Sequence, residues 1–214
     1  MRPIYLDIDP ANVSTTGFDT GLTGAGPFTP STTATPDGLA HQVSLTSTAN
    51  LSAITMTLVG TDADGRAQTE DVAGPNNNTV EGSKYFKTLT SIVASSTLGA
   101  STMDVGYVDE VASQTIPLDF YASDPASVQV SVTGTINFDV EGTLSNPFDT
   151  SRVSPFDFDD QSDLDWLNDS NFTSKTASLA NALAIPGIRA IRIVINSYTD
   201  TAELQVFITQ PQAN

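Results

Sequence analysis

The stretch Val128–Glu141 reads VQVSVTGTINFDVE and alternates apolar with polar side chains almost without interruption. Successive side chains of a β-strand point to opposite faces, so this pattern predicts a sheet with one buried and one exposed face. A two-residue turn at Thr133-Gly134 would reverse the alternation and expose Ile136. We therefore expect either one long strand bent at Gly134 or a bulged hairpin.

The same pattern recurs along the chain and predicts an all-β protein. Thr61–Arg66 has the Asp and Gly residues of a turn and predicts a hairpin between its flanking strands. A second hairpin is predicted at the end of the chain, with Asn196–Thr201 as its turn. Only Lys175–Leu183 suggests a helical turn. Short strands at this spacing are typical of antiparallel β-sandwich or jelly-roll-like modules. The predicted strands cover residues 4–8, 41–47, 54–58, 67–72, 79–88, 89–95, 102–108, 191–195 and 204–208.

Turn-rich stretches divide the chain into three predicted parts. Residues 1–38 are expected to be an extended strand followed by a long N-terminal arm or loop rich in Thr, Gly and Pro. That segment is either a surface loop of this chain or an arm that orders against a neighbouring subunit. Residues 39–114 and 115–214 are expected to form two β modules, the second with an acidic aromatic loop at 145–171.

Charge and residue usage exclude several function classes. The chain has 8 Lys and Arg residues, 25 Asp and Glu residues, a formal net charge of −17 and no cysteine. Proteins that neutralise phosphates need a basic surface, so we expect no direct binding to nucleic acid or to an anionic membrane. The lack of cysteine excludes disulfides and thiolate metal sites, and it agrees with assembly in a reducing cytoplasm. The first residues lack an apolar signal core, so export is not expected.

Residues for catalysis are scarce. His41 is the single histidine, which leaves a Ser-His-Asp triad with one possible base and disfavours a zinc site with several His ligands. We interpret His41 as a structural or surface residue and predict that the protein is not an enzyme and needs no cofactor.

Two acidic stretches are candidates for calcium sites. Asp62-Ala63-Asp64-Gly65 lacks the further ligands and the distal Glu of a calcium loop, so a hairpin turn explains it better. Residues 157–166 (DFDDQSDLDW) leave three interpretations open. They are an exposed acidic loop pinned by Phe156, Phe158 and Trp166, a subunit contact through these aromatic residues, or a calcium site.

Two groups of motifs point to a known family. The first comprises residues 58–70 (LVGTDADGRAQTE), Gly74-Pro75 and residues 84–92 (KYFKTLTSI). The second comprises residues 132–143 (VTGTINFDVEGT), Trp166 and residues 188–192 (IRAIR). Together they resemble accessory proteins of the tailed-bacteriophage virion, across roughly residues 40 to 210. The long acidic loop at Ser151–Asp165 departs from the family pattern, in which this loop is shorter.

The resemblance implies a capsid decoration or cement protein on the outside of the particle, made in the host cytoplasm. It also implies that the protein is a homotrimer and that its partner is the major capsid protein. The expected contacts are the Thr15–Pro36 segment, the acidic aromatic loop and the C-terminal tail. The candidate interface residues are Phe18, Phe28, Phe156, Phe158, Trp166 and Pro211. A tail, adaptor or baseplate component remains an alternative, as does a carbohydrate- or calcium-binding β-sandwich.

Overall fold

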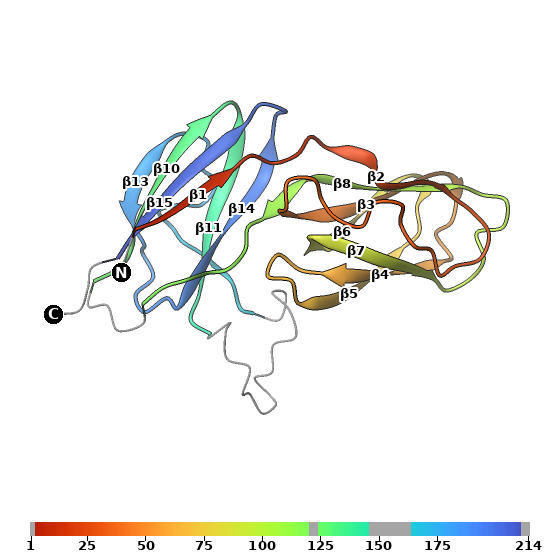
Figure 1. The fold of residues 1–214 in the computed structure, drawn as a ribbon, viewed down its shortest axis with the longest axis horizontal. Helices are drawn as coiled ribbons and strands as arrows, with labels where there is room; N and C mark the ends of the chain where they lie inside the picture. Colours follow the sequence, from red (N-terminus) through yellow and green to blue (C-terminus); the bar gives the residue numbers. More distant parts are fainter. Residues whose placement is uncertain (1–2, 120–123, 146–163, 211–214) are drawn as a thin grey trace. The chain divides into compact units, whose positions relative to one another are not determined.

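Strands provide the regular secondary structure of the computed structural model, which describes residues 3–119, 124–145 and 164–210. No helix occurs in these ranges (Figure 1), and strand pairs such as β1–β15, β11–β14 and β3–β6 are antiparallel. The chain divides into unit 1, made of Met1–Pro10 and Ala112–Asn214, and unit 2, made of Ala11–Val111. The predicted all-β class with antiparallel β-sandwich architecture is confirmed.

Unit 1 contains two groups of paired strands. One is a four-stranded sheet in the order β1-β15-β10-β13, and the other has the order β12-β11-β14 with β9 also paired to β14. The strands of the first sheet are β1 (Ile4–Ile8), β15 (Glu203–Thr209), β10 (Ser127–Thr133) and β13 (Leu179–Ala182). The others are β12 (Leu167–Asn168), β11 (Ile136–Thr143), β14 (Ala190–Tyr198) and β9 (Ile116–Pro117).

The decisive stretch Val128–Glu141 crosses from one sheet of unit 1 to the other. β10 pairs with β15, whereas β11 pairs with β14, and the chain bends between them at Gly134, which has φ of 74°. A Cβ atom at Gly134 would lie 2.9 Å from Cα of Ala202, so this corner has no room for a side chain. The bulged hairpin is therefore not formed, and in place of one long strand the chain continues through the bend as two strands in different sheets.

Two local predictions for unit 1 are wrong. β14 and β15 do not form a hairpin, because each pairs with other strands and they lie in different sheets. Their core-facing residues were nevertheless identified correctly, since all six are at most 1% exposed. The predicted helical turn at Lys175–Leu183 instead contains β13, where pairing with β10 outweighs local helix propensity. The six core-facing residues are Ile191, Ile193, Ile195, Leu204, Val206 and Ile208.

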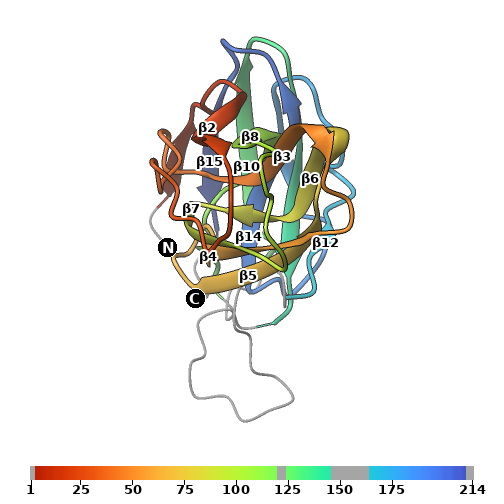
Figure 2. The ribbon, with the colours of Figure 1, turned by 90° about the vertical axis from the view of Figure 1, so that its right-hand side faces the viewer.

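Unit 2 is a sandwich of two sheets, seen as separate layers in Figure 2. One layer has the order β8-β3-β6 with β2 also paired to β8, and the other has the order β5-β4-β7. Apolar side chains from both layers, among them Phe18, Leu58 and Phe86, form its core. The first layer contains β8 (Met103–Ala112), β3 (Ala40–Asn50), β6 (Asn76–Phe86) and β2 (Ser14–Leu22). The second contains β5 (Ala67–Ala73), β4 (Thr55–Thr61) and β7 (Thr88–Ala94).

The predicted hairpin around Thr61–Arg66 is confirmed. β4 and β5 pair in continuous register from Thr55 opposite Ala73 to Thr61 opposite Ala67. The Asp62 carboxylate accepts hydrogen bonds from the backbone N–H groups of Asp64 and Arg66, both at 2.9 Å. This Asp therefore stabilises the turn, as the hairpin interpretation required.

The Thr/Gly/Pro segment, defined here as residues 14–38, packs along unit 2. Its first part is β2, which pairs with β8 in an interrupted register. Its second part reaches the edge of β7 through isolated bridges of Phe28 with Ile92 and of Ala34 with Thr88. The segment thus covers an edge strand that would otherwise expose unpaired backbone groups.

Candidate functional site

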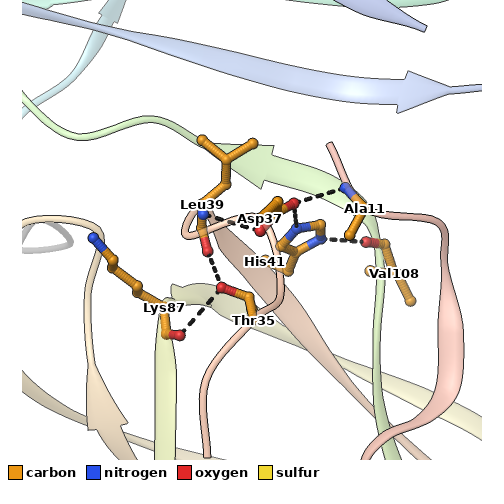
Figure 3. A network of polar contacts seen from close by, with 7 residues as sticks. All are labelled: Ala11, Thr35, Asp37, Leu39, His41, Lys87 and Val108. Atoms are coloured by element: carbon orange, nitrogen blue, oxygen red, sulfur yellow. Dashed lines mark hydrogen bonds and ion pairs between the residues drawn. The ribbon is translucent and has the colours of Figure 1, made fainter. Parts of the chain in front are cut away.

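A buried polar network attaches the end of the Thr/Gly/Pro segment to the rest of unit 2 (Figure 3). The His41 side chain is fully buried, and its Nε2 lies 2.7 Å from Oδ2 of Asp37. The same Asp37 oxygen accepts a hydrogen bond of 2.7 Å from the backbone N–H of Ala11, and Oδ1 accepts one of 3.0 Å from Leu39. Nδ1 of His41 lies 3.0 Å from the carbonyl oxygen of Val108. One carboxylate and one imidazole therefore bind three separate backbone groups, those of Ala11, Leu39 and Val108.

The partners of His41 determine where its protons lie. A carbonyl oxygen can only accept, so Nδ1 must donate to Val108. Hydrogen bonds from His41, Ala11 and Leu39 lower the pKa of Asp37, although burial, the largest single influence, acts in the opposite direction. Nε2 faces the Asp37 carboxylate on the opposite side of the ring, so both ring nitrogens have a partner within the protein. The Tyr107 ring lies 4.9 Å from the His41 ring, and burial together with the charge of Asp37 raises the pKa of its phenol.

The network fits a structural role better than catalysis. Both ring nitrogens of His41 are hydrogen-bonded to groups of the protein, so neither is left to accept a proton from a substrate. The ring is also fully buried. Thr35, which donates to the carbonyl oxygens of Leu39 at 2.6 Å and Lys87 at 3.3 Å, adds a second connection beside it. The interpretation of His41 as a structural residue is confirmed, and its alternative as a surface residue is wrong.

Trp166 directly precedes β12 and contacts a charged pair. The guanidinium carbon of Arg192 lies 4.4 Å from the centre of the indole ring, a distance typical of a cation–π contact. Nε of Arg192 donates to the Glu141 carboxylate at 2.7 Å. The indole is only partly buried, and the pairing of Gly142 with Leu167 places it beside the end of β11.

Two leucines at this edge of the sheet are exposed. Leu144, which follows the end of β11, is 52% exposed, and Leu167 is 47% exposed. Leu167 is opposite Gly142 and directly follows Trp166, so the side chains of Trp166 and Leu167 point to opposite sides of the edge. We call this exposed edge, with Leu144, Trp166 and Leu167, the leucine–tryptophan surface.

Of the other predicted interface residues, two are buried in the core and three lie outside the described residues. Phe18 is fully buried and Phe28 is 8% exposed, and both belong to the core of unit 2. Their rings are therefore taken up by the chain itself rather than presented to a partner, because the Thr/Gly/Pro segment folds back onto its own unit. Phe156, Phe158 and Pro211 lie outside the described residues.

One exposed feature was missed by the sequence analysis. Tyr5 and Phe207, on the outer face of the β1-β15-β10-β13 sheet, are 51% and 39% exposed, and their ring centres are 4.8 Å apart. The sequence contained a sign of this feature, because Tyr5 and Phe207 each stand at a position where the alternation of the strand predicts a polar, outward-facing side chain. Their proximity could not be read from the sequence, since they are separated by almost the whole chain.

A carboxyl pair lies beside these rings. A hydrogen bond to Asp7 and the charge of Asp7 raise the pKa of Glu203, with smaller effects from desolvation and Asp9. Desolvation and the same two carboxylates, Asp7 and Glu203, raise the pKa of Tyr5, whose phenol remains a neutral donor. This end of the sheet is therefore both aromatic and negatively charged.

Searches for metal-binding and membrane-spanning features in the described ranges were negative. No group of three or more His, Asp or Glu side chains there is arranged to hold a metal ion. No helix in those ranges is long and apolar enough to cross a bilayer. Comparison of the chain with protein-family models, with curated proteins and with solved structures finds no match.

Proposed function

We propose that this chain is a structural protein of a tailed-phage virion that decorates or cements the outer surface of the capsid. The observation that carries the proposal is a contrast between buried and exposed groups. The one histidine is used inside unit 2, whereas apolar side chains such as Leu144 and Leu167 are exposed on strands or at their ends. This distribution supports a protein that acts by contact, as does the resemblance of its motifs to those of virion accessory proteins.

The partners in this proposal are the major capsid protein and further copies of the chain in a homotrimer. Modest contacts repeated over many capsomers sum to a large stabilisation of the particle, because each attached subunit raises the effective concentration of the next contact. The charge of −17 keeps the free protein soluble before assembly in the host cytoplasm. It also disfavours nucleic acid and anionic membranes as partners.

The leucine–tryptophan surface is the best candidate for one of these contacts. Tryptophan and arginine side chains contribute much of the binding energy of many interfaces. Trp166 is held in place by Arg192, which is itself held by Glu141. Such an anchor loses little conformational freedom on binding, and this favours affinity.

Removal of the protein from the particle tests the proposal directly. Particles that lack this protein should release their genome at a lower temperature than complete particles, as measured by dye access to DNA during heating. Adding back purified protein should restore heat resistance. Unchanged heat resistance without the protein would exclude cementing.

Copy number separates the proposal from its nearest alternative, a tail, adaptor or baseplate component. A decoration protein occupies the whole shell, so its amount should be comparable to that of the major capsid protein. Quantitative gel densitometry of purified particles measures this ratio. A ratio of only a few copies per particle would favour the tail alternative.

The contact surface is tested by substitution. Leu144→Asp combined with Leu167→Asp should abolish binding to capsids that lack the protein, because two carboxylates would be buried without partners. Val93→Asp is the matched control, since Val93 is 41% exposed on β7 in unit 2. Equal capsid binding by both variants in a co-sedimentation assay would show that the leucine–tryptophan surface is not the contact.

A further inference from the structure

An exposed row of side chains crosses all four strands of one sheet in unit 1. Tyr5 on β1 pairs with Phe207 on β15, Phe207 pairs with Gln129 on β10, and Gln129 pairs with Ala180 on β13. Directly opposite residues of antiparallel strands point to the same face, so these four side chains form a continuous line across the sheet. At about 4.8 Å between strands, the line is roughly 14 Å long. That length suits a short linear ligand.

A hollow of about 330 Å³ lies along the same row. Phe207 and Gln129 line it, and the neighbouring row contributes only small side chains, because Ser127 pairs with both Thr209 and Ala182. A large ring next to a row of small residues produces the depression. Its volume lies at the lower end of the range of small-molecule sites.

The position of the hollow within the sheet limits the way a ligand can be recognised. β15 and β10 are each paired on both sides, so their backbone N–H and C=O groups are already used by neighbouring strands. A peptide therefore cannot add to these strands as a further strand, which is the usual mode at a sheet edge. Side chains must carry the recognition.

Those side chains are aromatic, amide and hydroxyl groups. Tyr5 and Phe207 offer partly exposed ring surface, while Gln129 and Thr209 carry hydrogen-bonding groups on exposed residues of the same face. Asp7 and Glu203 make the adjoining part of the face negative and so disfavour anionic ligands. The matching ligand has apolar C–H faces for the rings, hydroxyl groups for the amides and no negative charge.

We propose that the outer face of the β1-β15-β10-β13 sheet is a binding site for neutral oligosaccharides, with Tyr5 and Phe207 as the stacking platform and Gln129 as the central hydrogen-bonding group. Sugar rings lie along the row from β1 towards β13. The site gives the protein a glycan-binding activity beyond the contacts proposed above, and it stands whether or not the protein belongs to a capsid.

The test uses the full chain and a set of short neutral oligosaccharides derived from cellulose, xylan, mannan, chitin and starch. Titration followed by amide chemical shifts should move resonances of β10, β13 and β15 with at least one of them. Phe207→Ala should weaken that binding about tenfold, as expected for the loss of one aromatic contact together with its buried area. Ala180→Trp should abolish it, because the exposed Ala180 borders the hollow and tolerates a large side chain without disturbing the core.

Val93→Ala in unit 2 is the matched control and should leave binding unchanged. A cooperative thermal unfolding transition verifies that each variant is folded. If Phe207→Ala does not fold, Ala180→Trp alone tests the site. Anionic oligosaccharides from heparin and pectin should bind more weakly than neutral ones. The proposal is overturned if no neutral oligosaccharide moves these resonances, if both site variants bind like the unmodified chain, or if the anionic ligands bind equally well.

Discussion

Two segments near the start of the chain are attached to their units in different ways. β1 joins unit 1 as an edge strand and pairs with β15 in unbroken register from Ile4 opposite Ile208 to Ile8 opposite Leu204. The Thr/Gly/Pro segment joins unit 2 through the interrupted register of β2, two isolated bridges and the carboxylate of Asp37. One attachment is a regular ladder, and the other depends on particular side chains.

The difference explains which side chains remain exposed. In β1 the backbone ladder supplies the attachment, so Tyr5 and Asp7 on the outer face stay accessible. In the irregular segment, backbone pairing is sparse, and burial of Phe18, Phe28 and Asp37 must supply the rest. A segment held by its own side chains has fewer of them left to contact a partner. The following experiments test this comparison, from the largest expected effect to the smallest.

Phe18→Ala should produce the largest loss of stability. Phe18 is fully buried in the core of unit 2, and truncation of such a ring typically costs about 4 kcal/mol. Phe207→Ala removes the same atoms from an exposed position in unit 1 and should cost about 1 kcal/mol or less. Denaturant unfolding measures both free energies. Similar losses for the two variants would contradict the distinction between the segments.

Asp37→Ala should destabilise unit 2 by about 3 kcal/mol, because it leaves the fully buried His41 without its carboxylate partner. The backbone N–H groups of Ala11 and Leu39 lose their acceptor as well. Hydrogen exchange should show this loss in the residues around Asp37 and in β8. Asp7→Asn on β1 is the control and should cost nothing, since it relieves repulsion with Glu203. A neutral effect of Asp37→Ala would mean that backbone contacts alone hold the segment.

Gly17→Ala should cost about 2 kcal/mol through overpacking. A Cβ atom at Gly17 would lie 2.2 Å from Cε1 of Tyr107, whose ring packs edge-on against Phe18 and next to His41. The ring would have to shift and disturb both neighbours. Thr16→Ala, at the adjacent exposed position, should have little effect on the thermal unfolding temperature. Equal unfolding temperatures for the two variants would show that β2 can move away from Tyr107 without penalty.

A change of pH should alter the contributions of Asp37 and Glu203 to the free energy of unfolding in opposite directions. These effects should be the smallest of the set. The pKa of Asp37 is lowered, so its stabilising contribution is present above its unfolded pKa and is lost as pH falls through its folded pKa. The pKa of Glu203 is raised, so its contribution is present below its unfolded pKa and is lost as pH rises through its folded pKa.

The cost of Asp37→Asn should accordingly be largest near neutral pH and shrink in acid. Glu203→Gln should stabilise the protein near neutral pH, and this gain should disappear as the pH falls below the pKa of Glu203. Free energies of unfolding for the two variants and the unmodified chain, measured across the acidic range, give both trends. If Asp37→Asn and Glu203→Gln changed the free energy of unfolding in the same direction near neutral pH, the opposite pKa shifts assigned to Asp37 and Glu203 would be wrong.

Local pattern predicted part of the candidate sites as well as the fold. The turn at Asp62 followed from residue types alone, whereas the choice between a structural and a surface role for His41 needed the burial that the structure shows. The aromatic pair of Tyr5 and Phe207 did not, because two strands from opposite ends of the chain bring it together. The hollow beside Phe207 likewise depends on pairing between distant strands, since its small residues come from β10, β13 and β15.

The sequence by itself determined which side chains face inward. Alternation is a local property, and the six core positions of β14 and β15 are buried as the pattern required. Only the tertiary structure decided which strands pair, because partners are chosen by contacts between distant parts of the chain. For that reason the predicted terminal hairpin became two strands in different sheets, and the predicted helical turn at Lys175–Leu183 became an edge strand on β10.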